Sequence, residues 1–188
     1  MKRYTIAVRR WWTVPAALAL LVLVCVAAGA ADIPVPSLNG GTGSTQLAYF
    51  TPVLVVVAVM YCLDRRLRDV ESTAAVPVHR FDLGALVLTV VLAHAAGLVV
   101  GMDVARNITL LLALGLLTRR LANEAVAAAA GLLFLVLNVM LGRPYDPAGH
   151  VVHAWWALAL HPAGSLAAWL VASAVFVLAL KVSGPERR

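Results

Sequence analysis

Hydrophobic residues in this chain are gathered into long runs that contain no charged residue. Five such runs cover residues 14–31, 48–63, 83–100, 125–141 and 164–180, and each holds 16 to 18 residues. A helix needs about 20 predominantly apolar residues to cross a bilayer, with a lower limit near 17. The pattern therefore predicts five membrane-spanning helices separated by short polar connections.

A sixth run is shorter, because only twelve residues lie between Arg106 and Arg119. As a helix these residues would reach about 18 Å, compared with roughly 30 Å for the hydrocarbon core. The other basic residues nevertheless favour a crossing, since Lys and Arg near helix ends are retained on the cytoplasmic side. If this stretch crosses and the N-terminus is cytoplasmic, thirteen of the fifteen basic residues lie inside, and only Arg106 and Arg143 lie outside. Without the crossing, the split is nine to six.

The predicted fold is an all-α, polytopic integral membrane helix bundle of about six spans, with both the N- and C-termini cytoplasmic. The spans are expected at about 14–31, 48–63, 83–100, 104–118, 123–141 and 164–181, within a single transmembrane domain that covers 1–188. The first run also fits a cleaved export signal, but its 18 residues favour an uncleaved anchor. The expected location is the inner (plasma) membrane, with multiple passes.

Composition and charge exclude several other classes of protein. With 62% hydrophobic and 13% charged residues, the chain does not resemble a soluble globular domain. The net charge of +6 comes from basic residues at helix ends rather than on one soluble face, so it reflects topology and not nucleic-acid binding. Cys25 and Cys62 lie at different depths, and their spacing suggests neither a metal site nor a redox pair.

Polar residues within the predicted spans or at their outer ends are few. They include His94, Asp103, Arg106, Asn107 and Asn138. Because polar groups inside a membrane are costly and usually face a bundle interior, we expect these five to form one cavity or one hydrogen-bonded cluster in the outer half. A structural role, with Asp103 paired to Arg106 and the two Asn side chains joining helices, is favoured over a transport site.

Two connections on the outer side have different patterns. The first, around 32–46, is rich in Pro, Gly, Ser and Thr and predicts a flexible loop. The last, around 150–161, is apolar for only about ten residues, so we expect a re-entrant or interfacial piece with Trp155 and Trp156 at headgroup level. Its histidines could suggest zinc, but interfacial histidines are the simpler interpretation, and no catalytic, cofactor or metal site is predicted.

A cytoplasmic connection at 64–72 has charges four residues apart, as expected on an exposed helical face. The order of parts, taken as a whole, resembles the permease subunit of a type-two ABC exporter. That family is similar in having a basic amphipathic N-terminal segment, here 1–12, and six helices with cytoplasmic ends. It also has a cytoplasmic helix that contacts the ATPase, here 64–72, and a re-entrant piece between the fifth and sixth helices, here 151–160. The sequence stretches "RNITLLLALGLLTRRL" and "WWALALHP" also resemble parts of small actinobacterial membrane proteins associated with such transporters.

The resemblance implies a non-enzymatic membrane subunit of an exporter, with a separate ATP-binding subunit as partner. Arg65, Arg66 and Arg68 are the candidate ATPase-coupling residues. The chain would sit in the lipid bilayer as a homodimer or with a second permease chain. The alternative is an integral membrane scaffold or accessory protein that transports nothing.

Overall fold

The computed structural model describes residues 10–36, 42–64, 78–143 and 152–183, and six α-helices make up most of this part of the chain. They are α2 (Thr13–Ala28), α3 (Pro52–Asp64), α5 (Val78–Val100), α6 (Met102–Leu121), α7 (Glu124–Leu141) and α8 (Leu166–Val182). Two short 3-10 helices, η1 (Leu47–Phe50) and η2 (Leu158–Leu160), lie in the connections. The predicted all-α class is confirmed, and each of the six predicted spans overlaps one of these helices.

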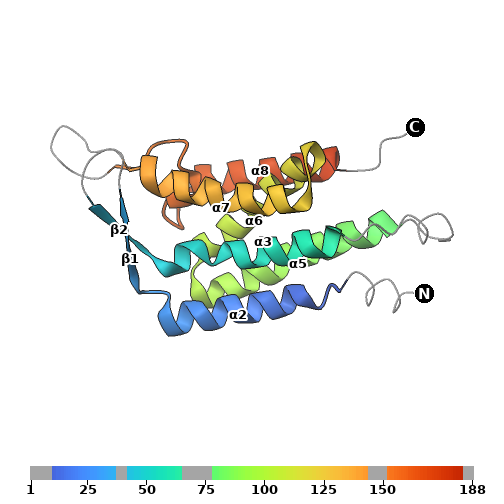
Figure 1. Ribbon diagram of the computed structural model, residues 1–188, viewed down its shortest axis with the longest axis horizontal. Helices are drawn as coiled ribbons and strands as arrows, with labels where there is room; N and C mark the ends of the chain where they lie inside the picture. Colours follow the sequence, from blue (N-terminus) through green and yellow to red (C-terminus); the bar gives the residue numbers. More distant parts are fainter. Residues whose placement is uncertain (1–9, 37–41, 65–77, 144–151, 184–188) are drawn as a thin grey trace.

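The helices run side by side along the long axis of the molecule (Figure 1), and α6 lies at the centre of the bundle. It packs against α3, α5, α7 and α8, whereas α2 packs on the outside against α3 and α5. The first turn of α2 and the last turn of α8 lie at the same end of the bundle. We call this the terminal end. The other end carries a small β-hairpin, and we call it the hairpin end.

Local sequence explains where several helices begin. The Asn123 side chain accepts a hydrogen bond from the backbone N–H of Val126 and so caps the start of α7. Ser165 caps α8 in the same way, through the N–H of Ala168. Between α5 and α6 the chain reverses at Gly101, whose φ of 121° disfavours any residue with a Cβ. The sharp reversal allows α6 to pack directly against α5.

The outer faces of the helices are apolar. Large hydrophobic side chains such as Leu98, Val99 and Leu166 are 70 to 80% exposed. The most polar helix, α6, is the most enclosed one, and every residue from Val104 to Ala113 is buried. The interior is itself mainly hydrophobic, and Arg106, Asn107 and Thr109 of α6 are buried within it.

Helices α2 and α3 are joined at both ends by a Thr–Cys pair. Thr13 Oγ1 lies 3.1 Å from Cys62 Sγ, and Cys25 Sγ lies 3.3 Å from Thr51 Oγ1. The two cysteines are at different depths, as predicted, and each is a reduced thiol within hydrogen-bonding distance of a hydroxyl on the other helix. These two contacts connect α2 with α3 and with the residue that immediately precedes α3.

The first outer connection is not the unstructured loop that its composition predicted. Residues Asp32–Pro36 (β1) and Thr42–Gln46 (β2) pair as an antiparallel hairpin, with Asp32 opposite Gln46 and Pro36 opposite Thr42. Arg143, just after α7, donates to the backbone carbonyl of Ser44 at 2.7 Å and fastens β2 to the bundle. The small sheet forms because the ends of α2 and α3 hold its two strands close together.

Two helical segments in the described ranges are long and apolar enough to cross a membrane, namely Arg80–Val100 and Glu124–Leu141. Three further apolar helices, at Thr13–Ala28, Leu47–Leu63 and Leu166–Val182, are shorter. Helix α6 does not meet the same criterion of length and apolarity. It extends the predicted span 104–118 at both ends and includes three arginines.

Candidate functional site

At the hairpin end, the chain between α7 and α8 folds back onto the bundle. We call residues 152–165 the fold-back segment. It contains η2 and packs against both α6 and α7. The Ala154 N–H donates to the carbonyl of Gly142 at 3.0 Å, and a Cβ at Gly142 would lie 2.6 Å from the Cβ of Ala157. The close approach of the segment to the end of α7 therefore depends on the absence of a side chain at Gly142.

Arg106 is the residue that holds this segment from inside the bundle. Its side chain is 0% exposed, and it lies one turn into α6. The Nη1 donates to the carbonyl of Pro162 at 3.0 Å, and Nη2 donates to the carbonyls of His161 at 2.7 Å and Ala159 at 3.3 Å. A guanidinium presents its N–H groups in a fixed planar fork, so one side chain can bind several carbonyls at once. Arg106 thus caps the C-terminal end of η2.

Asn107 completes the same cluster. Its Nδ2 donates to the carbonyl of Ala159 at 3.1 Å, and its Oδ1 accepts from Arg106 Nη2 at 3.3 Å. Both side chains are almost fully buried. A carbonyl oxygen buried without a donor costs about 1–3 kcal/mol, so the two side chains stabilise the carbonyl of the buried Ala159 in particular. We call Arg106, Asn107 and the three carbonyl groups the Arg106 cluster.

The cluster gives a physical reason for an Arg–Asn pair in so short an apolar run. The surroundings of Arg106 are protein, since α6 is enclosed by four other helices and by the fold-back segment. The predicted pairing with Asp103 is not a direct ion pair in the described part of the chain, where Arg106 donates to backbone carbonyls, but the Asp103 carboxylate is near enough to act on Arg106 electrostatically. A backbone carbonyl is neutral, so the positive charge of the cluster is not cancelled by its hydrogen-bond partners.

The other predicted members do not share hydrogen bonds with Arg106. The Nδ1 of His94 lies 2.7 Å from the carbonyl of Val90 in its own helix, and its imidazole packs 5.4 Å from the ring of Trp169 on α8. Asn138 donates to the carbonyl of Phe134, also in its own helix, and its buried Oδ1 has no partner among the described residues. The prediction that Asn138 joins two helices by a hydrogen bond is therefore wrong. Of the five predicted residues, only Arg106 and Asn107 are hydrogen-bonded to each other.

Two histidines of the fold-back segment lie near each other. The rings of His153 and His161 are 6.1 Å apart. Partial burial lowers the pKa of His153 below its ordinary value, and the neighbouring His161 and Arg143 lower it further. The described residues contain no group of three or more His, Cys, Asp or Glu side chains that could hold a metal ion. His150, the other histidine of the connection around 150–161, lies outside the described ranges.

At the terminal end, a second arginine of α6 fastens a different segment. Arg119 donates from Nη2 to the carbonyl of Leu63 at 2.9 Å, in the last turn of α3. Its Nε donates to Glu124 Oε1 at 2.9 Å, and this ion pair joins α6 to the first turn of α7. The predicted coupling residues Arg65, Arg66 and Arg68 lie outside the described residues. They follow α3 directly in the chain.

The binding partners of Arg106 could not be found from residue types. They are the backbone carbonyls of Ala159, His161 and Pro162, which are 53 to 56 residues distant and have no side-chain signature. The one available signal was the polar pair itself, in a run too short to be an ordinary span. Chemically, the cluster binds and positions a loop. Among the described residues of the Arg106 cluster there is no nucleophile paired with a base.

No protein-family model, curated protein or solved structure matches this chain.

Proposed function

We propose that this protein is the membrane-spanning permease subunit of an ABC-type exporter, driven by a separate ATP-binding subunit. The fold-back segment is the observation that carries the proposal. A re-entrant piece between the fifth and sixth helices is the part of the architecture that distinguishes this resemblance from a generic six-helix bundle. Here the segment returns toward the bundle between α7 and α8 and is fixed to the central helix by Arg106.

The distribution of charge and apolar surface supports insertion in a membrane. Seven basic residues lie in the described ranges, and five of them are at the terminal end: Arg10, Arg80, Arg119, Arg120 and Lys181. Only Arg106 and Arg143 are at the hairpin end. Because basic residues are retained inside, the terminal end would be cytoplasmic and the fold-back segment would face outward. The apolar outer faces would contact lipid.

The contacts of Arg119 support a route for coupling. A nucleotide-driven movement of the segment that follows α3 would first reach the last turn of α3. Through the Leu63 carbonyl, Arg119 ties that turn to α6 and, through Glu124, to α7. Helix α6 in turn holds the fold-back segment at its other end. Movement at the cytoplasmic surface would therefore be passed along one rigid helix to the outer end.

Reversal of the three candidate coupling charges tests the proposal. If Arg65, Arg66 and Arg68 bind an ATP-binding subunit, changing all three to Glu separates the subunits and abolishes transport-linked ATP hydrolysis. Changing them to Lys is the matched control, because the charge needed for insertion remains while the planar donor fork is lost. Partial coupling is expected for the Lys variant. A wild-type protein that brings down no ATP-binding chain from its native membrane, even after crosslinking, overturns the proposal.

Topology is checked separately, since the Glu variant also removes inside-positive charge. In a chain without Cys25 and Cys62, single cysteines at Ser44 and Met102 are expected to react in intact cells with a membrane-impermeant thiol reagent. A cysteine at Ala122 is expected to react only after lysis. Labelling of the Ala122 variant from outside would show that α6 does not cross, and would remove the exporter architecture.

One observation favours the second candidate, an integral membrane scaffold that transports nothing. The centre of the bundle is filled, because the side chains from Val104 to Ala113 are buried by the surrounding helices. A translocation path would therefore have to form between two chains, either in a homodimer or with a second permease chain. A protein that remains monomeric in its native membrane would favour the scaffold.

A further inference from the structure

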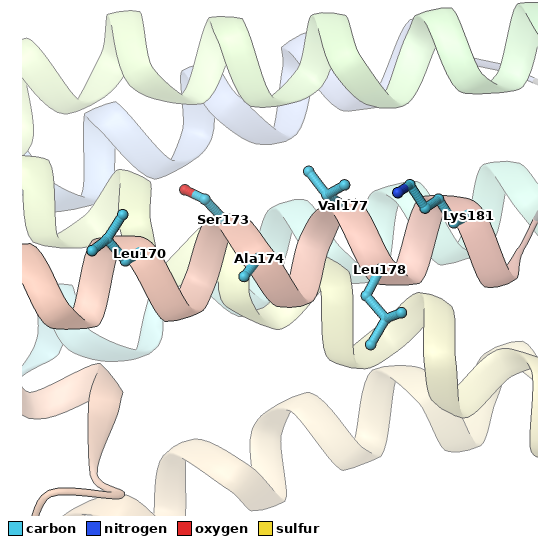
Figure 2. A pocket seen from close by; sticks show the side chains of 6 residues that line it. All are labelled: Leu170, Ser173, Ala174, Val177, Leu178 and Lys181. Atoms are coloured by element: carbon cyan, nitrogen blue, oxygen red, sulfur yellow. The ribbon is translucent and has the colours of Figure 1, made fainter.

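A shallow groove of about 470 Å³ lies along the outer face of α8. It is lined by Leu170, Ser173, Ala174, Val177, Leu178 and Lys181. Figure 2 shows Val177 and Leu178 diverging from the two sides of the helix, with the short side chains of Ser173 and Ala174 in the turn before them. Large residues at both ends and small ones between them create the hollow. The opposite face of α8, with Ala172 and Phe176, is buried in the bundle.

The groove has the length of one lipid chain. Leu170 and Lys181 are eleven residues apart, which corresponds to about 16 Å along a helix. One leaflet contributes half of the hydrocarbon core, or roughly 15 Å. The apolar lining therefore matches a single extended acyl chain that runs parallel to α8, and Lys181 marks the level at which the lipid headgroup begins.

Charge at one end gives the groove a direction. Lys181 is exposed in the last turn of α8, at the terminal end, and makes no ion pair with another described residue. An ammonium group at this level can bind a phosphate oxygen, and anionic lipids attract basic residues next to a membrane helix. Apolar contact alone would not select a lipid, because lipid tails are as apolar as the groove. Any selection must therefore come from Lys181.

We propose that this groove binds one anionic phospholipid of the leaflet on the terminal side, with an acyl chain along Leu170–Leu178 and the phosphate on Lys181. The inference rests on the proposed insertion in a membrane. A second copy of this chain is the competing occupant. Two parallel copies packed through this face would bring their Lys181 ammonium groups together, and the like charges would repel each other. Charge complementarity therefore favours the lipid.

Native mass spectrometry of the purified full chain tests the proposal. The protein is held in mild detergent with equal amounts of phosphatidylglycerol and phosphatidylcholine, and retained lipids are counted. We expect one tightly retained phosphatidylglycerol, favoured about fivefold over phosphatidylcholine by one basic residue at the surface. Lys181→Gln should abolish the preference while leaving weak retention of both lipids. Ala174→Phe should reduce retention of both, because the aromatic ring fills the groove.

Matched variants separate the groove from the rest of the surface. Arg80→Gln removes the same charge at the same end of the bundle, and Ala129→Phe adds the same ring on an exposed face of α7, so neither should change the result. Equal loss of preference in Arg80→Gln, or no preference in the wild type, overturns the lipid site. Dimers that Ala174→Phe dissociates and Lys181→Gln leaves intact would assign the groove to a second copy instead. Release of the wild-type protein from membranes by alkaline carbonate would contradict membrane insertion itself, and so distinguishes that failure from the failure of the lipid site.

Discussion

Two of the three arginines of helix α6, Arg106 near one end and Arg119 near the other, differ in what surrounds them. Arg106 is fully buried and donates to three backbone carbonyls and one amide, with no carboxylate among its hydrogen-bond partners. Arg119 is one-third exposed and divides its donors between the Leu63 carbonyl and the carboxylate of Glu124. Both arginines bind a neighbouring segment to the central helix, one in a buried site and the other in a partly exposed site.

The difference shows how this bundle accommodates polar groups. A partly exposed ion pair is solvated in both the folded and the unfolded protein, so its net contribution to the free energy of unfolding is small. A buried guanidinium depends on protein partners, and Arg106 has them at Nη1 and Nη2, while its Nε has none among the described residues. Its loss leaves the His161 carbonyl without a donor among the described residues, whereas the Ala159 and Pro162 carbonyls each keep another one. The fold-back segment is therefore expected to lose more stability when Arg106 is removed than the terminal end loses when Arg119 is removed.

The largest effect is expected from Arg106→Ala. The change removes a donor from the carbonyls of Ala159, His161 and Pro162 and leaves a cavity, so we expect a loss of roughly 3 kcal/mol in the free energy of unfolding. Thermal denaturation in mild detergent measures this loss. Arg106→Lys keeps the charge and loses the planar fork, and an intermediate loss is expected. If Arg106→Ala unfolds at the same temperature as the wild type, the fold-back segment is held by other contacts and the cluster is not its anchor.

The helices could be predicted from the sequence, whereas the contacts of the Arg106 cluster could not. The six helical segments follow from uncharged runs and their flanking charges, and their bounds agree within a few residues for most helices. Helix α6 was the exception, because its run of twelve uncharged residues is short compared with the hydrocarbon core. Its neighbours in the structure are other helices, and a local sequence pattern does not show which distant segments will pack against it. The hairpin was missed for a related reason, because the ends of α2 and α3 hold its two strands together.

Asn107→Leu is expected to have the second-largest effect. The substitution keeps the branched outline of the side chain, although Leu is larger, and removes the donor to the Ala159 carbonyl and an acceptor for Arg106. Leaving one buried carbonyl with fewer donors costs about 1–2 kcal/mol. Hydrogen exchange of residues 152–163 measures the local consequence, which should be faster exchange there and unchanged exchange in α2 and α3. Uniformly faster exchange would mean that Asn107 supports the whole bundle.

Arg119→Gln should have a smaller effect than either change at the hairpin end, about 1 kcal/mol or less, because the site is partly exposed. A double-mutant cycle with Glu124→Gln isolates the ion pair, and a coupling energy of roughly 0.5 kcal/mol is expected. Added salt should weaken this coupling and leave Arg106→Lys unaffected, since a buried site is screened less. A loss for Arg119→Gln equal to that for Arg106→Ala would remove the proposed contrast between the two ends.

The smallest expected effect is a pH dependence confined to the hairpin end. Because the pKa of His153 is lowered in the folded protein, the unfolded chain binds more protons than the folded one as the pH falls below about 6.5. The contribution to stability is therefore fully present above that pH and is lost on acidification toward the folded pKa. We expect slightly faster hydrogen exchange of residues 152–163 at pH 5 than at pH 7, after correction for the intrinsic exchange rate. His153→Gln should abolish the difference, and exchange around Arg119 should not respond. A response of equal size at both ends would show that a group other than His153 titrates.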